Sequence, residues 1–380
     1  MFLWQSSQWP EFQVDLAALQ PALAAARYAQ GRAIGMASHL QLMDMGDLQL
    51  QGWADEAVAT AQIEGEILQI NSVRASAARR LGLLDAKVSE RDARTEATLD
   101  VLQAAIEQSH KPLTHETLHD WQAALFPTGR SGIQKIRTGA YRDHAEPMQI
   151  VTPRIGKPDI VHYQAPDSAD VHAQMTRLVE WFNTGLGKTD GLVRAALAHL
   201  WLEAIHPFED GNGRVGRALV EMALAQDLKT DKRLWSLSHQ IWLDRAGYYA
   251  QLQAATGQAN MDVTPWVQWF VGCVHKAADA TWEHMQMAMR KTRFWAELRG
   301  QHPQLTPTQT KAINKLYDVG PDGFANGIST EKYVNLCRVS RATAYRELTA
   351  LCEMGVLVQT GAGRGTRYKL MYLLPSRCEI

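Results

Sequence analysis

The stretch that decides the fold is HPFEDGNGRVGR at residues 206–217. Apolar residues recur at helical spacing on both sides of it, over residues 192–205 and 218–225. A proline and several glycines interrupt that spacing between the two segments. We therefore predict a helix, a tight turn and a second helix that begins within the turn.

The turn also carries groups that suit a phosphorylated ligand. Backbone amides around Gly211, Asn212 and Gly213 would point at an anion beside the positive end of the second helix. Arg214 and Arg217 are three residues apart, so they share a helix face and can bind the same phosphates. This arrangement predicts a nucleotide-binding turn.

Two further residues of the stretch suit reactive roles. Asp210 is appropriate for a hard cation such as Mg²⁺, held jointly with phosphate oxygens. His206 lies near the positive helix end, which disfavours an imidazolium and keeps a neutral imidazole available as a base. The sequence therefore predicts a combined nucleotide and metal site.

Every specified position of the stretch matches HPFx(D/E)GNGRxxR, and in this the chain resembles the Fic family. The resemblance implies Mg²⁺-dependent transfer of AMP from ATP to a Ser, Thr or Tyr hydroxyl of a target protein. By the same resemblance His206 would deprotonate the hydroxyl and Asp210 would bind Mg²⁺. Residues 211–213 would form the anion site, with Arg214 and Arg217 on the β- and γ-phosphates.

A second pattern, TAQIEG at residues 60–65, fits the (S/T)xxxE(G/N) motif that Fic proteins use for inhibition. Thr60 and Glu64 are four residues apart and share a helix face. A carboxylate on that face could pair with Arg217 in bidentate geometry and withhold it from the γ-phosphate. The alternative interpretation is an ordinary solvated helix.

The sequence changes to a β-like texture over residues 148–163, around a turn containing Pro153, Gly156 and Pro158. In Fic proteins a flap at this position pairs with an extended segment of the target. The alternative is a hairpin that only covers the core. Tyr248 and Tyr249 resemble the tyrosines that flank the adenine in this family, with core packing as their alternative role.

The predicted fold is mainly α, with a Fic-type helical core and a β-hairpin flap. We predict an N-terminal helical region with the inhibitory motif (1–100), the catalytic core (101–298) and a C-terminal winged helix-turn-helix domain (303–380). The last is predicted from three helical segments followed by a hairpin, with residues 341–354 as a recognition helix that could meet DNA phosphates. Such domains also mediate protein contacts.

Composition adds few constraints on function. The 380 residues carry a net charge of −1 and are 46% hydrophobic, so the whole chain gives no electrostatic case for nucleic acid or a membrane. Four widely spaced cysteines and no leader or apolar span predict a cytoplasmic protein. The expected partners are ATP and a target protein, with DNA and a second copy of the chain as further candidates.

Three short motifs point elsewhere and are rejected on context. HETLH at residues 115–119 matches a zinc motif, but no third ligand follows at a recognisable spacing. GKT at residues 187–189 lacks the first glycine of a phosphate-binding loop. The glycines at 211, 213 and 216 spell a dinucleotide motif, but a helix precedes them where a strand is required.

Two functional alternatives to AMP transfer remain open at this point. One is a DNA-binding transcriptional regulator whose core senses a nucleotide. The other is removal of AMP from a modified protein, with Glu64 aligning a water molecule; the same nucleotide cradle serves both directions.

Overall fold

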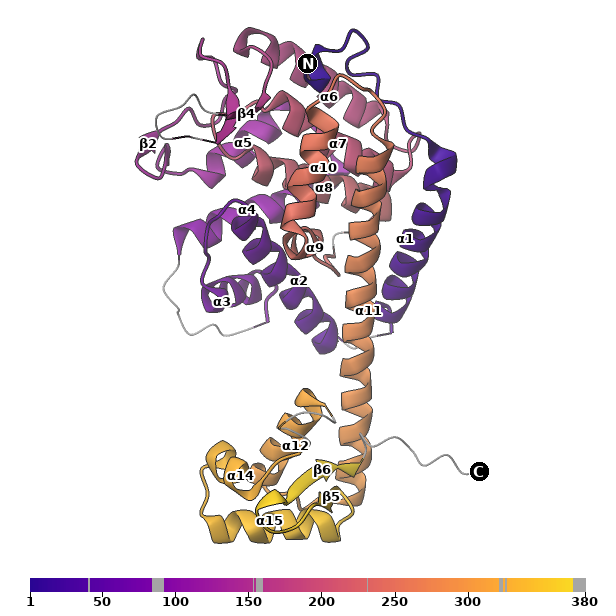
Figure 1. Ribbon diagram of the computed structural model, residues 1–380, viewed down its shortest axis with the longest axis vertical. Coiled ribbons are helices and arrows are strands. Elements are labelled where there is room, and N and C mark those ends of the chain that lie inside the picture. The colour runs from indigo at the N-terminus through magenta and orange to yellow at the C-terminus, as the bar shows by residue number, and fades with distance from the viewer. Residues whose placement is uncertain are drawn as a thin grey trace. The chain divides into compact units, whose positions relative to one another are not determined.

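The computed structural model describes residues 1–39, 42–83, 92–152, 154, 160–230, 232–320, 324 and 327–371. The chain forms two compact units, Met1–Met285 and Gln286–Ile380, each of which is mainly helical (Figure 1). The predicted mainly α fold class is therefore confirmed. The predicted domain boundaries near residues 100 and 298 remain predictions.

The first unit contains the helices α1 (Leu16–Ala37), α2 (Leu42–Ile63), α3 (Ile70–Arg80), α4 (Ala93–Glu107), α5 (His115–Leu125), α6 (Ser168–Thr184), α7 (Gly191–Ile205), α8 (Asn212–Leu228), α9 (Leu237–Leu243) and α10 (Arg245–Thr256). Short 3₁₀ turns lie at Leu3–Gln5 and Gln108–His110. Its strands are β1 (Arg130–Ser131), β2 (Gln134–Lys135), β3 (Gln149–Thr152) and β4 (Ile160–Gln164). Helix α11 (Thr264–Gln301) begins in this unit and ends in the second.

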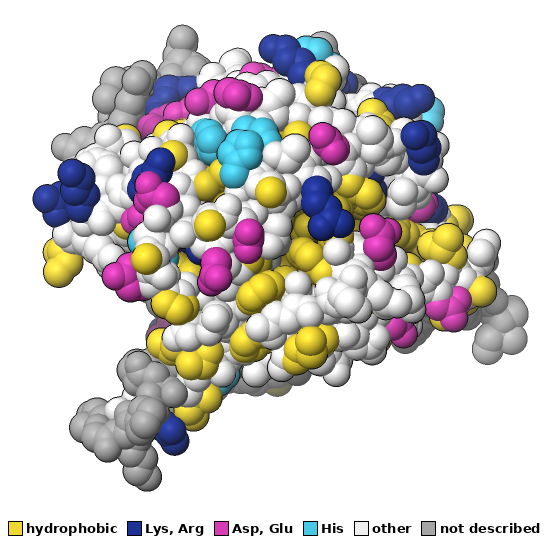
Figure 2. Space-filling view, turned by 90° about the horizontal axis from the view of Figure 1, so that it is seen from above, with side chains coloured by type: hydrophobic (Ala, Val, Ile, Leu, Met, Phe, Trp, Pro, Cys, Tyr) yellow, Lys and Arg dark blue, Asp and Glu magenta, His cyan; other side chains and the backbone are white. Residues whose placement is uncertain are grey.

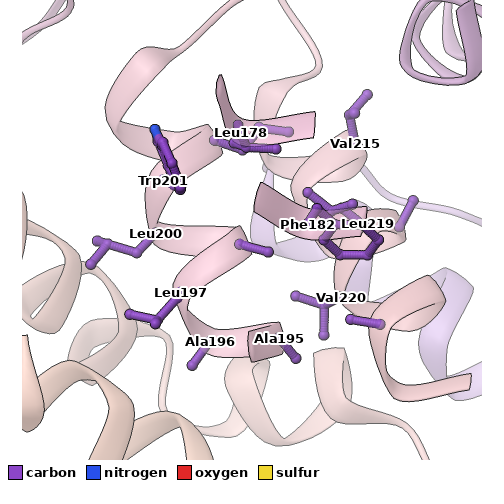
Figure 3. Packing of buried hydrophobic residues seen from close by; sticks show 14 of the residues in the cluster. Leu178, Phe182, Ala195, Ala196, Leu197, Leu200, Trp201, Val215, Leu219 and Val220 are labelled. Atoms are coloured by element: carbon purple, nitrogen blue, oxygen red, sulfur yellow. The ribbon is translucent and has the colours of Figure 1, made fainter. Parts of the chain in front are cut away.

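Helix α7 is the centre of the first unit. Its side chains are mostly apolar and nearly all buried, as expected of a helix enclosed by others. Figure 3 shows Leu178 and Phe182 of α6, and Val215, Leu219 and Val220 of α8, packed beside it. Neither α7 nor any other helix in the described ranges is long and apolar enough to cross a membrane.

The turn between α7 and α8 is fixed by its own residues. His206 ends α7 in the left-handed region, with φ 50°, and Gly211 precedes α8 with φ 90°. The buried Asn212 side chain holds both sides of the turn. Its Oδ1 accepts from the Phe208 amide and its Nδ2 donates to the Phe208 carbonyl, each at 2.8 Å. A Cβ at position 211 would meet the ring of Phe126, so this position requires glycine for two reasons.

Helix α2 brings the TAQIEG motif to α8. It packs against α3, α4, α8 and α9 through a buried cluster that includes Trp53, Ala57 and Ala61. At its C-terminal end the Ile63 carbonyl accepts hydrogen bonds from Arg245 Nη2 at 2.8 Å and from the Tyr249 hydroxyl at 3.0 Å. These donors satisfy a carbonyl that a helix end leaves without an intrahelical partner.

The predicted hairpin is present as β3 and β4, which pair antiparallel from Gln149–Gln164 to Thr152–Ile160. The Tyr163 hydroxyl donates to the Ala204 carbonyl of α7 at 2.5 Å, which attaches the hairpin to the core. Several apolar side chains of its strands are exposed, namely Ile150, Val151, Ile160 and Val161. Pro153, Gly156 and Pro158 of the predicted turn lie outside the described residues.

The second unit contains α12 (Pro307–Val319), α14 (Thr330–Cys337), α15 (Arg341–Glu353), β5 (Leu357–Thr360), a 3₁₀ turn (Gly363–Gly365) and β6 (Arg367–Leu370). Strands β5 and β6 pair antiparallel, and the core includes Ile313, Tyr333 and Leu348. Arg338 turns the chain between α14 and α15 with φ 54°. These helices and strands lie in the predicted ranges, and the winged-helix assignment remains a prediction.

We expect Leu200→Ala to destabilise the first unit by about 2–5 kcal/mol, because Leu200 is fully buried on α7. Thermal unfolding of the purified protein, followed by circular dichroism, should show a lower midpoint. Leu186→Ala, at a site 49% exposed, is the control and should change the midpoint little. Equal shifts for the two variants would contradict the central place given to α7.

Candidate active site

A cavity of about 520 Å³ opens above the turn between α7 and α8, within the size range of small-molecule sites. Its wall includes residues of the turn, the TAQIEG motif, the hairpin and α10. They include Glu64, Met148, Ile150, His162, Glu203, His206, Asp210, Gly211, Asn212, Gly213, Tyr248 and Tyr249. Residues predicted separately from distant parts of the sequence therefore meet at one cavity.

Arg217 is almost completely buried on α8 and is bound by the end of α2. Its Nε donates to Thr60 Oγ1 at 2.6 Å, and its Nη2 donates to the Thr60 carbonyl at 3.0 Å. Nη2 also pairs with Glu64 Oε1 at 2.8 Å. The contact with Glu64 uses one guanidinium nitrogen, in contrast to the bidentate pair we expected, because Thr60 takes the Nε edge. Burial opposes the charge, and the Glu64 carboxylate raises the pKa of Arg217 above its usual range.

The approach of Glu64 depends on Gly213. A Cβ at this position would overlap Glu64 Oε1, so a side chain there would push the carboxylate away from Arg217. Gly213 lies in the first turn of α8, where main-chain amides have no intrahelical acceptor. The Glu64 carboxylate thus occupies space beside an anion-attracting helix end.

Arg214, the other predicted phosphate ligand, is also paired with a carboxylate. Its Nη1 lies 2.9 Å from Glu66 Oε1, and its Nη2 lies 3.5 Å from Asp210 Oδ1. Glu66 was not among the residues predicted from the sequence. The signal was present, because an acidic residue follows Glu64 after a single glycine, and Gly65 has φ 80°. Two carboxylates of one short segment therefore bind the two arginines.

His206 presents a neutral imidazole to the cavity. Burial and the Arg142 guanidinium lower its pKa to about 4, so the ring is uncharged at neutral pH. Its Nδ1 lies 3.9 Å from Glu203 Oε2. The predicted source of this neutrality was the helix end; the larger causes in the structure are burial and Arg142.

Arg142 is a second residue that the sequence did not single out. It is buried, its Nε donates to the His206 carbonyl at 2.9 Å, and its main-chain amide donates to the Pro207 carbonyl at 2.9 Å. It thereby holds the C-terminal end of α7 on which His206 lies. A lone arginine 64 residues before the histidine carries no local signal of this role.

Asp210 lies at the cavity wall with 38% of its side chain exposed. Its Oδ1 accepts from the Gly211 amide at 2.5 Å, and its Oδ2 accepts from Ser131 Oγ. No group of three or more His, Cys, Asp or Glu among the described residues could hold a metal ion. The donor set fits a magnesium ion carried largely by phosphate oxygens, with one carboxylate from the protein.

The two predicted tyrosines differ in their surroundings, although both line the cavity. Tyr248 is buried, and its hydroxyl lies 2.8 Å from His199 Nε2. Tyr249 is 42% exposed and donates to the Ile63 carbonyl. A role of either ring beside an adenine remains a prediction.

The histidines of the rejected zinc motif have other partners. His115 Nδ1 lies 2.8 Å from the Tyr141 hydroxyl, its Nε2 lies 3.2 Å from Thr176 Oγ1, and its ring stacks on His172 at 4.8 Å. Figure 2 shows several histidine side chains gathered in one surface patch. Burial lowers the pKa of both His115 and His119, so both favour the neutral state.

Comparisons with family models give two matches along the chain. Residues 112–224 match the Fic/DOC family, and residues 2–83 match a domain of unknown function, DUF4172. The first range contains the turn, the hairpin and α7. The second contains the TAQIEG motif.

Curated relatives match over part of their length. The chain is 32% identical over 145 residues to "Protein adenylyltransferase fic-1" of Caenorhabditis briggsae, covering 38% of this chain and 26% of that protein. It is 28% identical over 176 residues to "Protein adenylyltransferase Fic" of Drosophila willistoni, covering 46% and 31%. The matched segments thus span less than a third of these relatives.

Solved structures share the fold at low sequence identity. A Fic family protein from Desulfovibrio desulfuricans G20 has a TM-score of 0.50 and 21% identity, over 92% of this chain and 96% of that one. A signalling protein with a Fic domain from Bacteroides thetaiotaomicron has a TM-score of 0.52 and 17% identity, over 69% and 98%. These likenesses support the Fic-type helical fold.

We expect ATP with Mg²⁺ to bind more tightly when the carboxylate of Glu64 or Glu66 is replaced by an amide. The phosphates would then no longer compete with that carboxylate for its arginine. Glu64→Gln should tighten the dissociation constant about tenfold, and Glu66→Gln, whose arginine partner is slightly less buried, about threefold. Isothermal titration calorimetry measures both values. Glu283→Gln, an exposed position on α11, is the control and should match the unaltered protein. Unchanged affinity in both site variants would show that neither carboxylate competes for the arginines.

Proposed function

We propose that this chain, whose residues 112–224 form a domain of the Fic/DOC family, transfers AMP from ATP to a hydroxyl side chain of a target protein. The observation that carries the proposal is a neutral His206 at a cavity whose wall also includes Asp210 and Glu64, the carboxylate that pairs with Arg217 of α8. The names of the curated relatives support the same class of reaction. Because those matches cover less than a third of each relative, the activity of this chain is inferred from its own site.

In the proposed reaction, the oxygen of the target hydroxyl attacks the α-phosphorus of ATP. His206 accepts the hydroxyl proton, the new oxygen–phosphorus bond forms, and the bond from the α-phosphorus to the bridging oxygen breaks to release pyrophosphate. Arg214 and Arg217 would hold the departing phosphates by charge-assisted hydrogen bonds. The residues contribute mainly by positioning the reactants and balancing charge.

Asp210 would hold a magnesium ion together with the phosphates. The bound ion would supply neutralisation of the phosphate charge. Asp210 is itself positioned by the Gly211 amide and by Ser131. The exposed apolar strands β3 and β4 would pair with an extended segment of the target and bring its hydroxyl to the cavity.

Glu64 would restrain this reaction by occupying Arg217. Arg217 is buried and Glu64 is its acidic partner at 2.8 Å, so a phosphate must displace that carboxylate to take its place. Glu66 would act in the same way on Arg214. The proposed resting state is therefore one in which protein carboxylates stand where nucleotide phosphates would bind.

Labelling with ATP that carries a radioactive α-phosphate tests the proposal. We expect Glu64→Gly to raise self-labelling and labelling of proteins in a cell lysate by roughly tenfold or more, since a charged hydrogen bond is released. Adding His206→Ala should abolish labelling, whereas ATP binding measured by calorimetry should persist. Label from γ-labelled ATP should not be incorporated, because pyrophosphate leaves.

The outcomes separate the two parts of the proposal. Equal labelling by the Glu64→Gly variant and the unaltered protein would show that Glu64 does not inhibit the reaction. Labelling that persists in the His206→Ala variant would show that this histidine is not the general base. Glu283→Gln serves again as the control for a surface carboxylate.

The second unit favours DNA as a further partner. Residues 286–380 contain fourteen Lys and Arg against seven Asp and Glu, a net charge of +7, although the whole chain carries −1. On α15, Arg341, Tyr345 and Arg346 are exposed, and Arg341 and Tyr345, four residues apart, share one face. A positive unit with basic side chains along an exposed helix fits the phosphates of duplex DNA.

We expect the full chain to bind duplex DNA with an affinity that falls steeply between 50 and 200 mM salt. Replacing Arg341 and Arg346 by Ala should weaken binding by about tenfold or more, as each loses a phosphate contact. Fluorescence anisotropy with a labelled random duplex measures this. An affinity for DNA that does not depend on the salt concentration, or that is unchanged in the Arg341→Ala, Arg346→Ala double variant, would favour protein contacts for this face.

A further inference from the structure

Two buried polar atoms at the base of the cavity make no hydrogen bond among the described residues. One is Glu203 Oε1 and the other is His206 Nδ1. Most buried polar groups in proteins have partners, so such atoms call for an explanation. Both belong to the last turn of α7 and its cap, and both side chains line the cavity.

The two side chains face each other. Glu203 Oε2 lies 3.9 Å from His206 Nδ1, and the side chains are only 12% and 16% exposed. A neutral histidine that accepts a proton on Nε2 must carry its own proton on Nδ1. An Nδ1–H that is buried needs an acceptor, and the side-chain oxygens of Glu203 are within a small rotation of it.

We propose that Glu203 is a positioning residue for His206, accepting a hydrogen bond from Nδ1–H so that Nε2 stays free to take the target's proton. This inference rests on the proposed AMP transfer and deepens it. When His206 gains the second proton, Glu203 also balances the new positive charge. The arrangement has the same logic as a carboxylate behind the histidine of a hydrolytic triad.

The surroundings of Glu203 connect this role to inhibition. Burial raises the pKa of Glu203 to about 8, the Glu64 carboxylate adds to this, and Arg217 opposes it. The charged and titratable groups around it are Glu64 at the end of α2, Arg217 on α8, Tyr163 on β4, Tyr248 on α10, and His199 and His206 at either side along α7. Departure of Glu64 removes one cause that keeps Glu203 protonated, and so favours the ionised acceptor.

The main-chain carbonyl of Glu203 is the competing acceptor, because it also interacts with the His206 ring. If that carbonyl alone orients the ring, the carboxylate is dispensable. The two accounts differ in what happens when the side chain loses its oxygens and the backbone stays unchanged.

The test uses the full chain with Glu64→Gly as the background, to which Glu203→Leu or Glu203→Gln is added. Glu203→Leu removes the acceptor at similar volume, and Glu203→Gln keeps an oxygen acceptor without charge. We expect Glu203→Leu to lower kcat for self-labelling about tenfold to a hundredfold, with KM for ATP changed less than about threefold. The kcat of Glu203→Gln should lie between that of the Glu64→Gly background protein and that of Glu203→Leu.

A second readout does not depend on activity. In protein labelled with ¹⁵N-histidine, the His206 signal is identified by its loss in His206→Ala, and its ring shifts report which nitrogen carries the proton. We expect the Nδ1–H tautomer in the background protein and an increased share of Nε2–H in Glu203→Leu. An unchanged tautomer and unchanged kcat in Glu203→Leu would overturn the proposal.

The same measurements separate failure of the inference from failure of the proposed function. If the Glu64→Gly background shows no labelling at all, the transfer activity is wrong, whereas the tautomer still tests the contact. Thermal unfolding shows whether Glu203→Leu folds. If it does not fold, the kcat and the His206 tautomer of Glu203→Gln test the proposal instead. A drop in kcat with an unchanged tautomer would also reject the positioning role.

Discussion

The site depends on a buried positive charge that must have partners. Arg217 lies on α8 with its side chain only 3% exposed, in a place where an unpaired guanidinium would be costly. Thr60 and Glu64 supply those partners from α2. A ligand that pairs with Arg217 must therefore replace this carboxylate with an anion of its own, which ties its binding to the position of α2.

The same constraint explains several other features. Gly213 lacks a side chain where Glu64 approaches, and Gly65 turns the chain so that Glu66 reaches Arg214. Arg245 and Tyr249 hold the carbonyl that ends α2, which limits how far Glu64 can move. The proposed restraint would thus belong to a helix end that is fixed at several points.

Much of the local structure could be predicted from short patterns. The turn at residues 206–217, the helices on either side and the hairpin followed from apolar spacing, glycines and prolines, because those signals act within a few residues. The long-range partners of the site could not be predicted in the same way. Glu66 and Arg142 act through contacts that only tertiary packing creates; a second acidic residue beside Glu64 was a local sign of the first, whereas nothing in the neighbourhood of Arg142 marks it. The pairing of Glu64 with Arg217 was accessible only because a family motif linked two distant segments, and its geometry differed because Thr60 also competes for the guanidinium.

The most direct measurement is a crystal structure of the Glu64→Gly variant with magnesium and an ATP analogue that cannot be cleaved. We expect the triphosphate to lie about 3 Å from the amides at residues 211–213 and from the guanidinium groups of Arg214 and Arg217, with Glu66 displaced. We also expect His206 to face the α-phosphate. A nucleotide bound away from the start of α8, or arginines still paired with protein carboxylates beside it, would contradict the account.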